Sequence, residues 1–410
     1  MSAASAVTDQ SSGVAGTAGA LTDEERLLQQ TVRDFARREL APGAAERDEE
    51  ERYSRSLFAR MGELGLTAVP FPADVGGAGF SYRAWTLVME EIAYADMAMA
   101  VSLSVHILSQ YPVITWGSDE QKARWLPEML AGTKLGAFAL TEPQAGSDAS
   151  ALRLRADRVT GDRSDNRESA TAYRLTGSKI WITNAIEAEH YLVFATVDPA
   201  AGANGITAFL VEKGMPGFKF GRREKKLGIR SDTASELIFE GCEVPAANRL
   251  GDEGQGYRIA LSGLSEGRIS IAAACVGLAQ AALDAAARHL LERRAFGTTL
   301  SEMQGLRFML AEMAQQVAAA RALTRAAAEA KDRGENIAEA SSLAKWTASD
   351  AAMSVSTDAV QLLGGSGYSR EFPVERFMRD AKGAQIYEGT NQIHRLIVAD
   401  HLLKRIAEQP

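Results

Sequence analysis

The spacing of apolar residues changes twice along the 410-residue chain and divides it into three segments. A first helix is predicted from Thr22, where Glu25 follows three residues later as in a capping box, and it runs at helical spacing to Pro42. The same spacing predicts helices over 56–66, 82–95 and 119–130, with a Pro/Gly loop at 70–80. We therefore expect a helical domain over residues 21–135.

Residues 136–250 have a different pattern, in which short apolar or alternating runs are separated by turn residues. Such runs are typical of strands, and they occur at 171–175, 191–196, 206–211 and 236–239. The polar segment 161–169 fits a hairpin loop. This part of the chain is predicted to be a β domain of short antiparallel strands.

Helical spacing returns from about Gly256 in three long Ala/Leu-rich segments at 257–291, 302–333 and 338–363. Their lengths suit a four-helix bundle over residues 251–410, with the segment around Glu388 starting the last helix. The order of helices, strands and helices differs from a doubly wound nucleotide-binding fold, in which strands and helices alternate. The predicted class is α+β, mostly α.

Composition and charge narrow the class of protein. Residues 1–20 are small, polar and glycine-rich, so we expect a disordered tail that lacks the pattern of a signal or transit peptide. The net charge of −8 gives no basic footprint for nucleic acid, and no run approaches ~20 continuous apolar residues as a membrane span requires. We expect a cytoplasmic protein.

The two cysteines, Cys242 and Cys275, fall in different predicted elements, so they indicate neither a disulfide framework nor a zinc site. Of the five histidines only His394 and His401 lie near each other, at a spacing that matches no metal-ligand pattern. A reducing compartment and no metal are expected.

Glu388 is the most informative single residue. It precedes Gly389 and stands between a mostly apolar stretch, 384–387, and an amphipathic segment. Desolvation raises the pKa of a carboxyl group and makes the carboxylate a better base, so Glu388 is a candidate for proton abstraction. A glutamate that only complements a helix dipole would fit the same local pattern.

Two glycine-rich stretches do not carry the chemistry that they first suggest. The stretch at 363–368 follows a helix instead of a strand, which excludes a dinucleotide-binding fingerprint. The stretch at 145–148 lacks the flanks of a nucleophile elbow and has no nearby histidine. Both fit backbone turns.

Eight motifs in the same order and spacing make the chain resemble the acyl-CoA dehydrogenase family over residues 22–405. They are ALTEP at 139–143, AGSD at 145–148, KIWITN at 179–184, KLGIR at 226–230, RRAFG at 293–297, QLLGG at 361–365, PVER at 373–376 and RDAK at 379–382. The resemblance implies an N-terminal helical domain, a central antiparallel β domain and a C-terminal four-helix bundle.

The resemblance also implies an FAD enzyme that converts an acyl-CoA thioester to the trans-2-enoyl-CoA and passes electrons to an electron-transfer flavoprotein. Glu388 matches the family's base, which takes the α-proton while flavin N5 takes the β-hydride. Its own backbone N–H and a flavin hydroxyl would bind the thioester carbonyl, because the developing enolate oxygen needs stabilisation. Since some matched cofactor sites cross subunits, a homo-oligomer is implied, usually a tetramer.

Site residues carry over position by position. Residues that match flavin contacts on the β domain are Phe138, Leu140, Thr141, Gly146, Ser147, Trp181 and Thr183. Those that match FAD contacts elsewhere, in part across subunits, are Arg293, Phe296, Gln304, Gln361, Gly365, Thr390 and Gln392. Those that match the substrate site are Ser147, Arg268, Tyr387 and Gly389. On their own, Trp181 would also fit a core residue of the β domain, and Arg293 a charge on a solvated helix face.

Two departures from the family pattern lie on the helix that carries Arg268. Ser265 stands where many relatives carry Asp, which puts that CoA contact in question. Some relatives place the base one residue before the arginine, where this chain has Gly267. Glu266, one residue earlier, is turned about 100° around the helix and would face elsewhere, so the base stays with Glu388.

The length of the substrate's acyl chain and the electron acceptor remain open at this point. Residues 237–264 look most like short- and branched-chain members, and 361–396 like short- and medium-chain ones. One alternative is an oxidase variant that uses O₂. Another is a member of the fold that has lost the chemistry and binds DNA or a partner protein, against which the acidic balance and the intact Glu388 both count.

Overall fold

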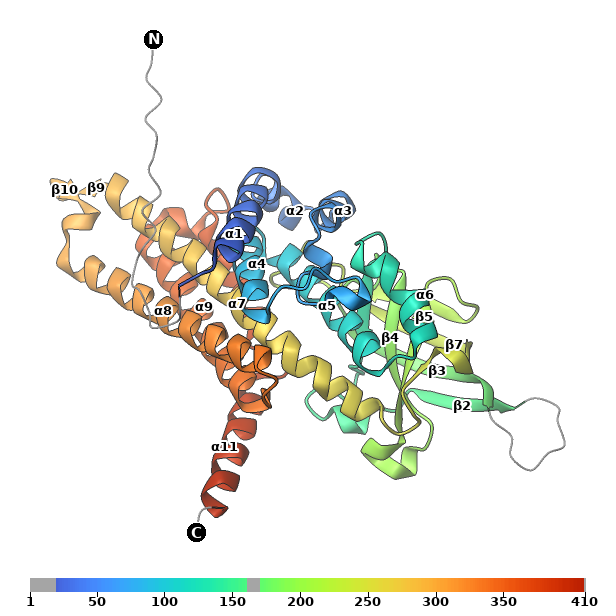
Figure 1. The fold of residues 1–410 in the computed structure, drawn as a ribbon. Coiled ribbons are helices and arrows are strands. Elements are labelled where there is room, and N and C mark those ends of the chain that lie inside the picture. The colour runs from blue at the N-terminus through green and yellow to red at the C-terminus, as the bar shows by residue number, and fades with distance from the viewer. Residues whose placement is uncertain (1–19, 161–169, 409–410) are drawn as a thin grey trace.

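The computed structural model describes residues 20–160 and 170–408, and its layers follow the predicted order of helices, sheet and helices (Figure 1). The predicted disordered tail, apart from residue 20, and the predicted hairpin loop at 161–169 lie outside the described residues.

Six α-helices form the N-terminal layer. They are α1 (Asp23–Phe35), α2 (Ala44–Glu49), α3 (Arg55–Glu63), α4 (Tyr82–Ala95), α5 (Met97–Trp116) and α6 (Asp119–Leu130), and α1 continues into a π-helical turn, Ala36–Leu40. The capping box is present, since Thr22 Oγ1 accepts from the Glu25 N–H and the Glu25 carboxylate accepts from the Thr22 N–H. The sequence did not predict α5, because this helix is apolar on nearly every side and so lacks an amphipathic period.

The central layer is one twisted sheet. Its strands are β1 (Gly136–Ala139), β2 (Arg155–Thr160), β3 (Ala170–Ile182), β4 (His190–Thr196), β5 (Ile206–Glu212), β6 (Phe218–Arg223), β7 (Ser235–Pro245) and β8 (Arg249–Leu250). The order is β6-β7-β3-β2-β4-β5-β8, with β1 beside β4. All four runs predicted from the sequence fall within these strands. Pairing is antiparallel as predicted, except that β1 and β2 each lie parallel to β4.

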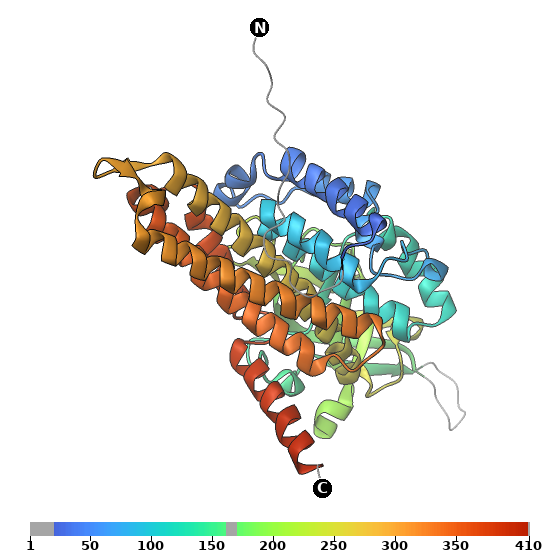
Figure 2. The same cartoon turned by 60° about the vertical axis from the view of Figure 1, so that its left-hand side comes forward.

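The C-terminal layer contains α7 (Gly256–Glu292), α8 (Gln304–Asp332), α9 (Ala338–Leu363), α10 (Val374–Ala384) and α11 (Asn391–Ala407). The three long helices lie side by side, and the small hairpin β9 (Arg294–Ala295) and β10 (Thr298–Thr299) projects at their far end (Figures 1 and 2). Only Asn391 and His394 of α11 are buried, and the rest of α11 extends away from the body (Figure 2). The segment around Glu388 was predicted to start the last helix, but α11 begins at Asn391, so Glu388 itself lies in the loop before it. Most of α11 lies outside the bundle.

Helix α7 contacts every layer. A Cβ at Gly256 would stand 2.6 Å from the backbone of Thr207 in β5, and one at Gly277 would collide with the backbone of Glu90 in α4. These glycines let helix and neighbour backbones approach closely. Both α5 and α7 are long and apolar enough to cross a membrane by composition, but 83% of each apolar window is buried within the fold, as in a core helix.

Candidate active site

Glu388 lies in the short loop between α10 and α11. Both Glu388 (φ 54°) and Gly389 (φ 94°) have left-handed backbone conformations, which are rare for a residue with a side chain. Thr390 then caps α11, because its Oγ1 accepts from the Ile393 N–H at 3.4 Å. The two left-handed residues turn the chain so that the Glu388 side chain points toward α7.

The Glu388 carboxylate has no hydrogen-bond partner among the described residues. The residue as a whole is partly exposed, but both carboxylate oxygens are inaccessible to solvent. They lie against Gly267 of α7, where an ideal Cβ would stand 2.6 Å from Oε2. Gly267 therefore provides the space that the carboxylate occupies.

Burial raises the pKa of Glu388 to about 7, while the charges of Lys345 and Arg268 act in the opposite direction. An unpaired carboxyl group poised near neutral pH is suited to take a proton at physiological pH. The geometry therefore agrees with the predicted base and disfavours a charge that only complements a helix dipole, since such a charge would be solvated.

Two buried cations hold the backbone around Glu388. Lys345 Nζ donates to the Gly389 carbonyl at 2.8 Å, and Arg268 Nε lies 3.4 Å from the Glu388 carbonyl, a long and weak contact. Neither side chain has a hydrogen bond to the Glu388 carboxylate in the described structure. The predicted residues Arg268, Tyr387, Glu388 and Gly389 thus lie together.

Sequence reasoning missed Lys345 and His394. Lys345 is fully buried on the inner face of α9, where its helical neighbours are small residues such as Ser341, Ala348 and Ser349. A single lysine on an otherwise small, uncharged helix face was the available signal. His394 is also fully buried, neither ring nitrogen has a partner in the described structure, and burial lowers the pKa of its imidazole to about 3, which keeps it neutral.

The predicted flavin contacts of the central layer lie on β1, on the loop that follows it and around the end of β3. Phe138 and Leu140 are nearly buried, whereas Gly146 and Ser147 are exposed. The loop that carries them is tied to β3, because the Thr141 carbonyl accepts from the Ile180 N–H at 2.9 Å. Lys179 Nζ reinforces this link by donating to the Leu140 carbonyl at 2.9 Å and to Glu142 at 2.7 Å.

The loop at 226–232 connects the end of β3 to α10, the helix before Glu388. On one side, Asp232 Oδ1 accepts from the Asn184 N–H at 3.3 Å, next to Thr183. On the other side, the buried Asp380 of α10 accepts from the Ile229 N–H at 2.5 Å. The chain segments around Thr183 and Glu388 therefore flank a shared structural support.

Residues around the end of β3 and on the loop after β1 fit a flat aromatic cofactor. Trp181 is 54% exposed and has a left-handed backbone (φ 60°), a strained conformation that directs a large apolar side chain toward solvent. A Cβ at Gly146 would meet no atom within 4 Å, so the space beside that loop is open. An exposed indole, an open glycine loop and the adjacent Thr141 and Thr183 suit a flavin ring.

The other predicted cofactor residues lie in the C-terminal layer. Arg293, Phe296 and Gln304 are exposed near the hairpin at the far end of the long helices, and Phe296 is 97% exposed with φ 52°. Gln361 and Gly365 are exposed at the end of α9, and Gln392 is exposed on α11. Thr390, directly after Gly389, adjoins Glu388 in the chain. That Arg293, Phe296 and Gln304 reach the FAD of a neighbouring subunit stays a prediction.

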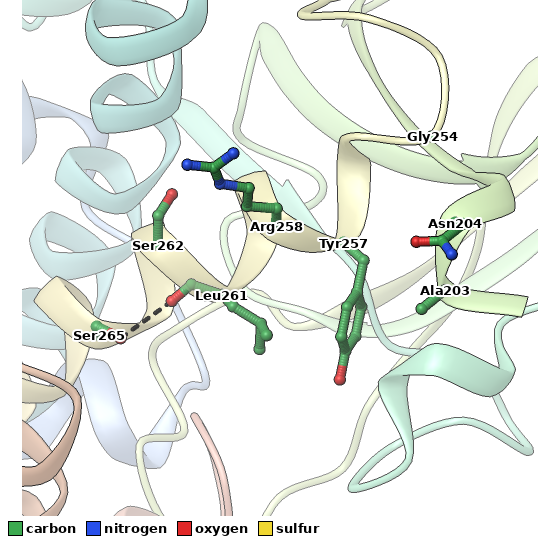
Figure 3. Close-up of a pocket in the computed structure, with 8 residues that line it drawn as sticks. All are labelled: Ala203, Asn204, Gly254, Tyr257, Arg258, Leu261, Ser262 and Ser265. Carbon is green, nitrogen blue, oxygen red and sulfur yellow. Dashed lines mark hydrogen bonds between the residues drawn. The ribbon is translucent and has the colours of Figure 1, made fainter.

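Glu266 is directed elsewhere, as predicted, because its buried carboxylate forms an ion pair with the partly exposed Lys331 of α8. Ser265 lines an open cavity of about 390 Å³ at the start of α7. Figure 3 shows Tyr257 and Leu261 of α7 extending to the same side of this cavity, with Ala203 and Asn204 nearby. The cavity lies along the helix that also carries Gly267.

Three family models match the chain consecutively. The acyl-CoA dehydrogenase N-terminal domain matches residues 22–133, the middle domain 137–242 and the C-terminal domain 254–403.

Individual relatives agree over nearly the full length. The short-chain specific acyl-CoA dehydrogenase of Sus scrofa mitochondria is 44% identical, over 94% of this chain and 91% of the relative. The solved butyryl-CoA dehydrogenase of Megasphaera elsdenii is 41% identical with a TM-score of 0.90, over 94% of this chain and all of that one. A solved chain from work on the electron transferring flavoprotein of Acidaminococcus fermentans is 44% identical with a TM-score of 0.90, over 94% of this chain and 99% of that one. The chain therefore belongs to the acyl-CoA dehydrogenase family.

Proposed function

We propose that this oxidoreductase introduces an α,β double bond into an acyl-CoA thioester and that Glu388 abstracts the α-proton. The observation that carries the proposal is the buried, unpaired carboxylate of Glu388 against Gly267. An ion pair would stabilise the ionised form of a carboxylate, lower its pKa and make it a weaker base. Burial instead raises the pKa of Glu388 to about 7. Gly267 of α7, against which the carboxylate lies, has no side chain to compete for the position.

The α-proton of a thioester is weakly acidic, so its removal requires stabilisation of the developing enolate oxygen as well as a base. We assign this stabilisation in part to the Glu388 backbone N–H, held by the left-handed turn at 388–389. Bound FAD would supply the acceptor for the hydride that leaves the β-carbon. Phe138, Leu140, Thr141, Gly146, Ser147, Trp181 and Thr183 would hold its ring.

A short acyl chain is the proposed substrate, because the Sus scrofa relative is a short-chain specific acyl-CoA dehydrogenase and the similar Megasphaera elsdenii structure is a butyryl-CoA dehydrogenase. The cavity at the start of α7 would accept part of the CoA moiety. It offers Tyr257 and Leu261 as apolar surface and Ser265 as a hydrogen-bonding group, in place of the Asp of many relatives. Neutral Ser265 would bind CoA without adding a negative charge beside its phosphates.

Electron-transfer flavoprotein is the proposed acceptor of the electrons. The similar chain from work on the Acidaminococcus fermentans electron transferring flavoprotein supports this partner. The exposed Arg293, Phe296 and Gln304 support a homo-oligomer, expected to be a tetramer, in which these residues reach a neighbouring subunit.

Anaerobic titration of the purified yellow protein with acyl-CoAs from C4 to C16 tests the reaction and the chain length. The flavin is expected to bleach, with the highest kcat/KM near C4, and E388Q is expected to keep its flavin but lose nearly all turnover. No bleaching by any thioester, or full activity in E388Q, would refute the proposal. Reoxidation by electron-transfer flavoprotein, but only slowly by O₂, would separate a dehydrogenase from the oxidase alternative.

A further inference from the structure

Lys345 is a buried cation beside the base with no salt-bridge partner within 4 Å among the described residues. Its side chain has no solvent exposure, and Nζ donates to the Gly389 carbonyl at 2.8 Å and to Asn391 Oδ1 at 3.3 Å. An ammonium group buried without a carboxylate partner is costly. Such a group requires an explanation, since a methionine of similar length would fill the same space.

The two acceptors of Lys345 flank the turn that carries the base. Gly389 is the second left-handed residue of that turn, and Asn391 begins α11. Asn391 is held in turn by Ser349 of α9, whose Oγ accepts from Asn391 Nδ2 at 2.9 Å, and by Asp350, which accepts from the same amide at 2.8 Å. Lys345 therefore binds the loop from α9.

The charged and titratable groups that face Lys345 are few. Burial lowers the pKa of Lys345 to about 8, while Cys275 of α7 and Glu388 raise it, Arg268 lowers it and Asp350 raises it. Cys275 is a neutral thiol, because burial raises its pKa to about 12. His394, whose ring lies beside Gly389, is neutral as well. Glu388 and Asp350 are therefore the acidic groups that balance Lys345 and Arg268.

We propose that Lys345 is a positioning residue for proton abstraction, which holds the Gly389 carbonyl so that the left-handed turn presents an unpaired Glu388 carboxylate toward Gly267. This inference rests on the proposed role of Glu388 as the base. The hydrogen bond fixes the peptide between Gly389 and Thr390, and the positive charge favours the ionised form of the carboxylate without masking its oxygens. A direct salt bridge would supply the same charge but occupy the atoms that must accept the proton.

Two substitutions separate the hydrogen bond from the charge. In K345M both are lost, whereas the amide of K345Q can still donate but carries no charge. A rise of about 1 in the pKa of Glu388 would lower its ionised fraction at pH 7 about fivefold. Both variants are therefore expected to lose about fivefold in kcat/KM at pH 7 and to recover activity at higher pH, and K345M is expected to lose more kcat at all pH values.

The measurement is the pH profile of kcat/KM for the FAD-loaded enzyme, together with an infrared titration of the protonated carboxyl band that E388Q removes. The control is S349A, which removes a hydrogen bond from Asn391 on the same face of α9 but leaves the lysine in place. S349A is expected to lower thermal stability without shifting the pH at which kcat/KM falls on the acidic side of its profile. K345Q carries the test alone if K345M does not fold.

An acidic limb and a carboxyl titration that stay at the wild-type pH in the folded lysine variants would overturn the inference. So would equal losses in K345M and S349A without a change in pH profile, because they would show a purely structural role. Retained turnover in E388Q would instead remove the proposed function itself, so the two failures are distinguishable.

Discussion

The carboxylate of Glu388 occupies space that a side chain at Gly267 would fill, because an ideal Cβ at Gly267 would stand 2.6 Å from Glu388 Oε2. The glycine belongs to a long helix, and the glutamate to a loop 121 positions later in the sequence. A base on α7 and a base at position 388 would compete for the same volume. The position of the Glu388 carboxylate therefore depends on the absence of a side chain at Gly267.

A Gly267→Ala variant tests this relationship. The added methyl group must displace the carboxylate, and misplacing a base by about 1 Å can cost about 100-fold. We expect G267A to fold, retain flavin and lose 10-fold or more in kcat. Its matched control is G263A, one turn earlier on α7, where a Cβ would meet Leu108 Cδ1 at 3.2 Å and no part of the base. Similar kcat losses in both variants would contradict the prediction.

The acidic limb of the pH profile should report Glu388. Because the base must be ionised, kcat/KM is expected to rise with pH through about 7, the pKa that burial gives this group. Steady-state assays from pH 5 to 9 with a slowly reacting thioester measure it. A profile that is flat between pH 5 and 8 would exclude a base with this pKa.

Glu388 also links stability to pH. Its folded pKa of about 7 exceeds the ordinary value of 4.5, so the folded state binds the proton more tightly and stability falls as pH rises between these values. E388Q has no such penalty. We expect it to be more stable than the wild type by on the order of 2 kcal/mol at pH 8 but not at pH 4, as measured by urea unfolding of matched FAD-loaded samples. An equal difference at both pH values would contradict this linkage.

Asp380 is expected to be a structural support for the site. It is buried, its pKa is raised to about 7 by burial, and it accepts from the N–H of Ile229, which has a left-handed backbone. D380A would leave that N–H unpaired, at a cost of about 1–3 kcal/mol. D380N keeps an acceptor oxygen and is the control. Thermal denaturation and flavin retention should fall in D380A and stay nearer wild type in D380N.

The buried pair of Lys179 and Glu142 ties the loop at 139–148 to β3. K179M is expected to destabilise the protein by about 3–5 kcal/mol, because it leaves a buried carboxylate without its cation. It should also weaken flavin binding, since the Leu140 carbonyl loses its donor. The double variant E142Q/K179M removes both charges and should recover much of the stability in urea unfolding. No recovery would show that the charge pair is not the cause.

Phe296 provides a test of assembly. Phe296 is 97% exposed at the tip of a hairpin, so its ring is accessible to a neighbouring subunit, where the family resemblance places it. We expect F296S to shift the mass measured by light scattering toward smaller species and to lower FAD content, with S301A in the following turn as the control. An unchanged mass and FAD content would remove Phe296 from the interface.

The sequence predicted the long helices and the four recognised strands because their apolar spacing is regular, and α4 and α6 end at the predicted residues. It missed α5, which is buried on nearly all sides and has no period to detect. The base was predicted through family motifs, yet its environment was not. No pattern in the sequence reveals that Gly267 leaves room for Glu388, or that Lys345, 43 positions before it, reaches the next carbonyl. Those relationships depend on how α7, α9 and the loop pack.

Helix α7 fits against β5 at Gly256, against Glu388 at Gly267 and against α4 at Gly277. One residue inserted between these points would turn the following part of the helix by about 100° and move it about 1.5 Å along its axis. Each glycine after the insertion would then present its bare face to the wrong neighbour. The three layers are consequently poor modules for recombination: a chimera that exchanges one of them must keep the register of α7, whereas loops at the surface are free to vary in length.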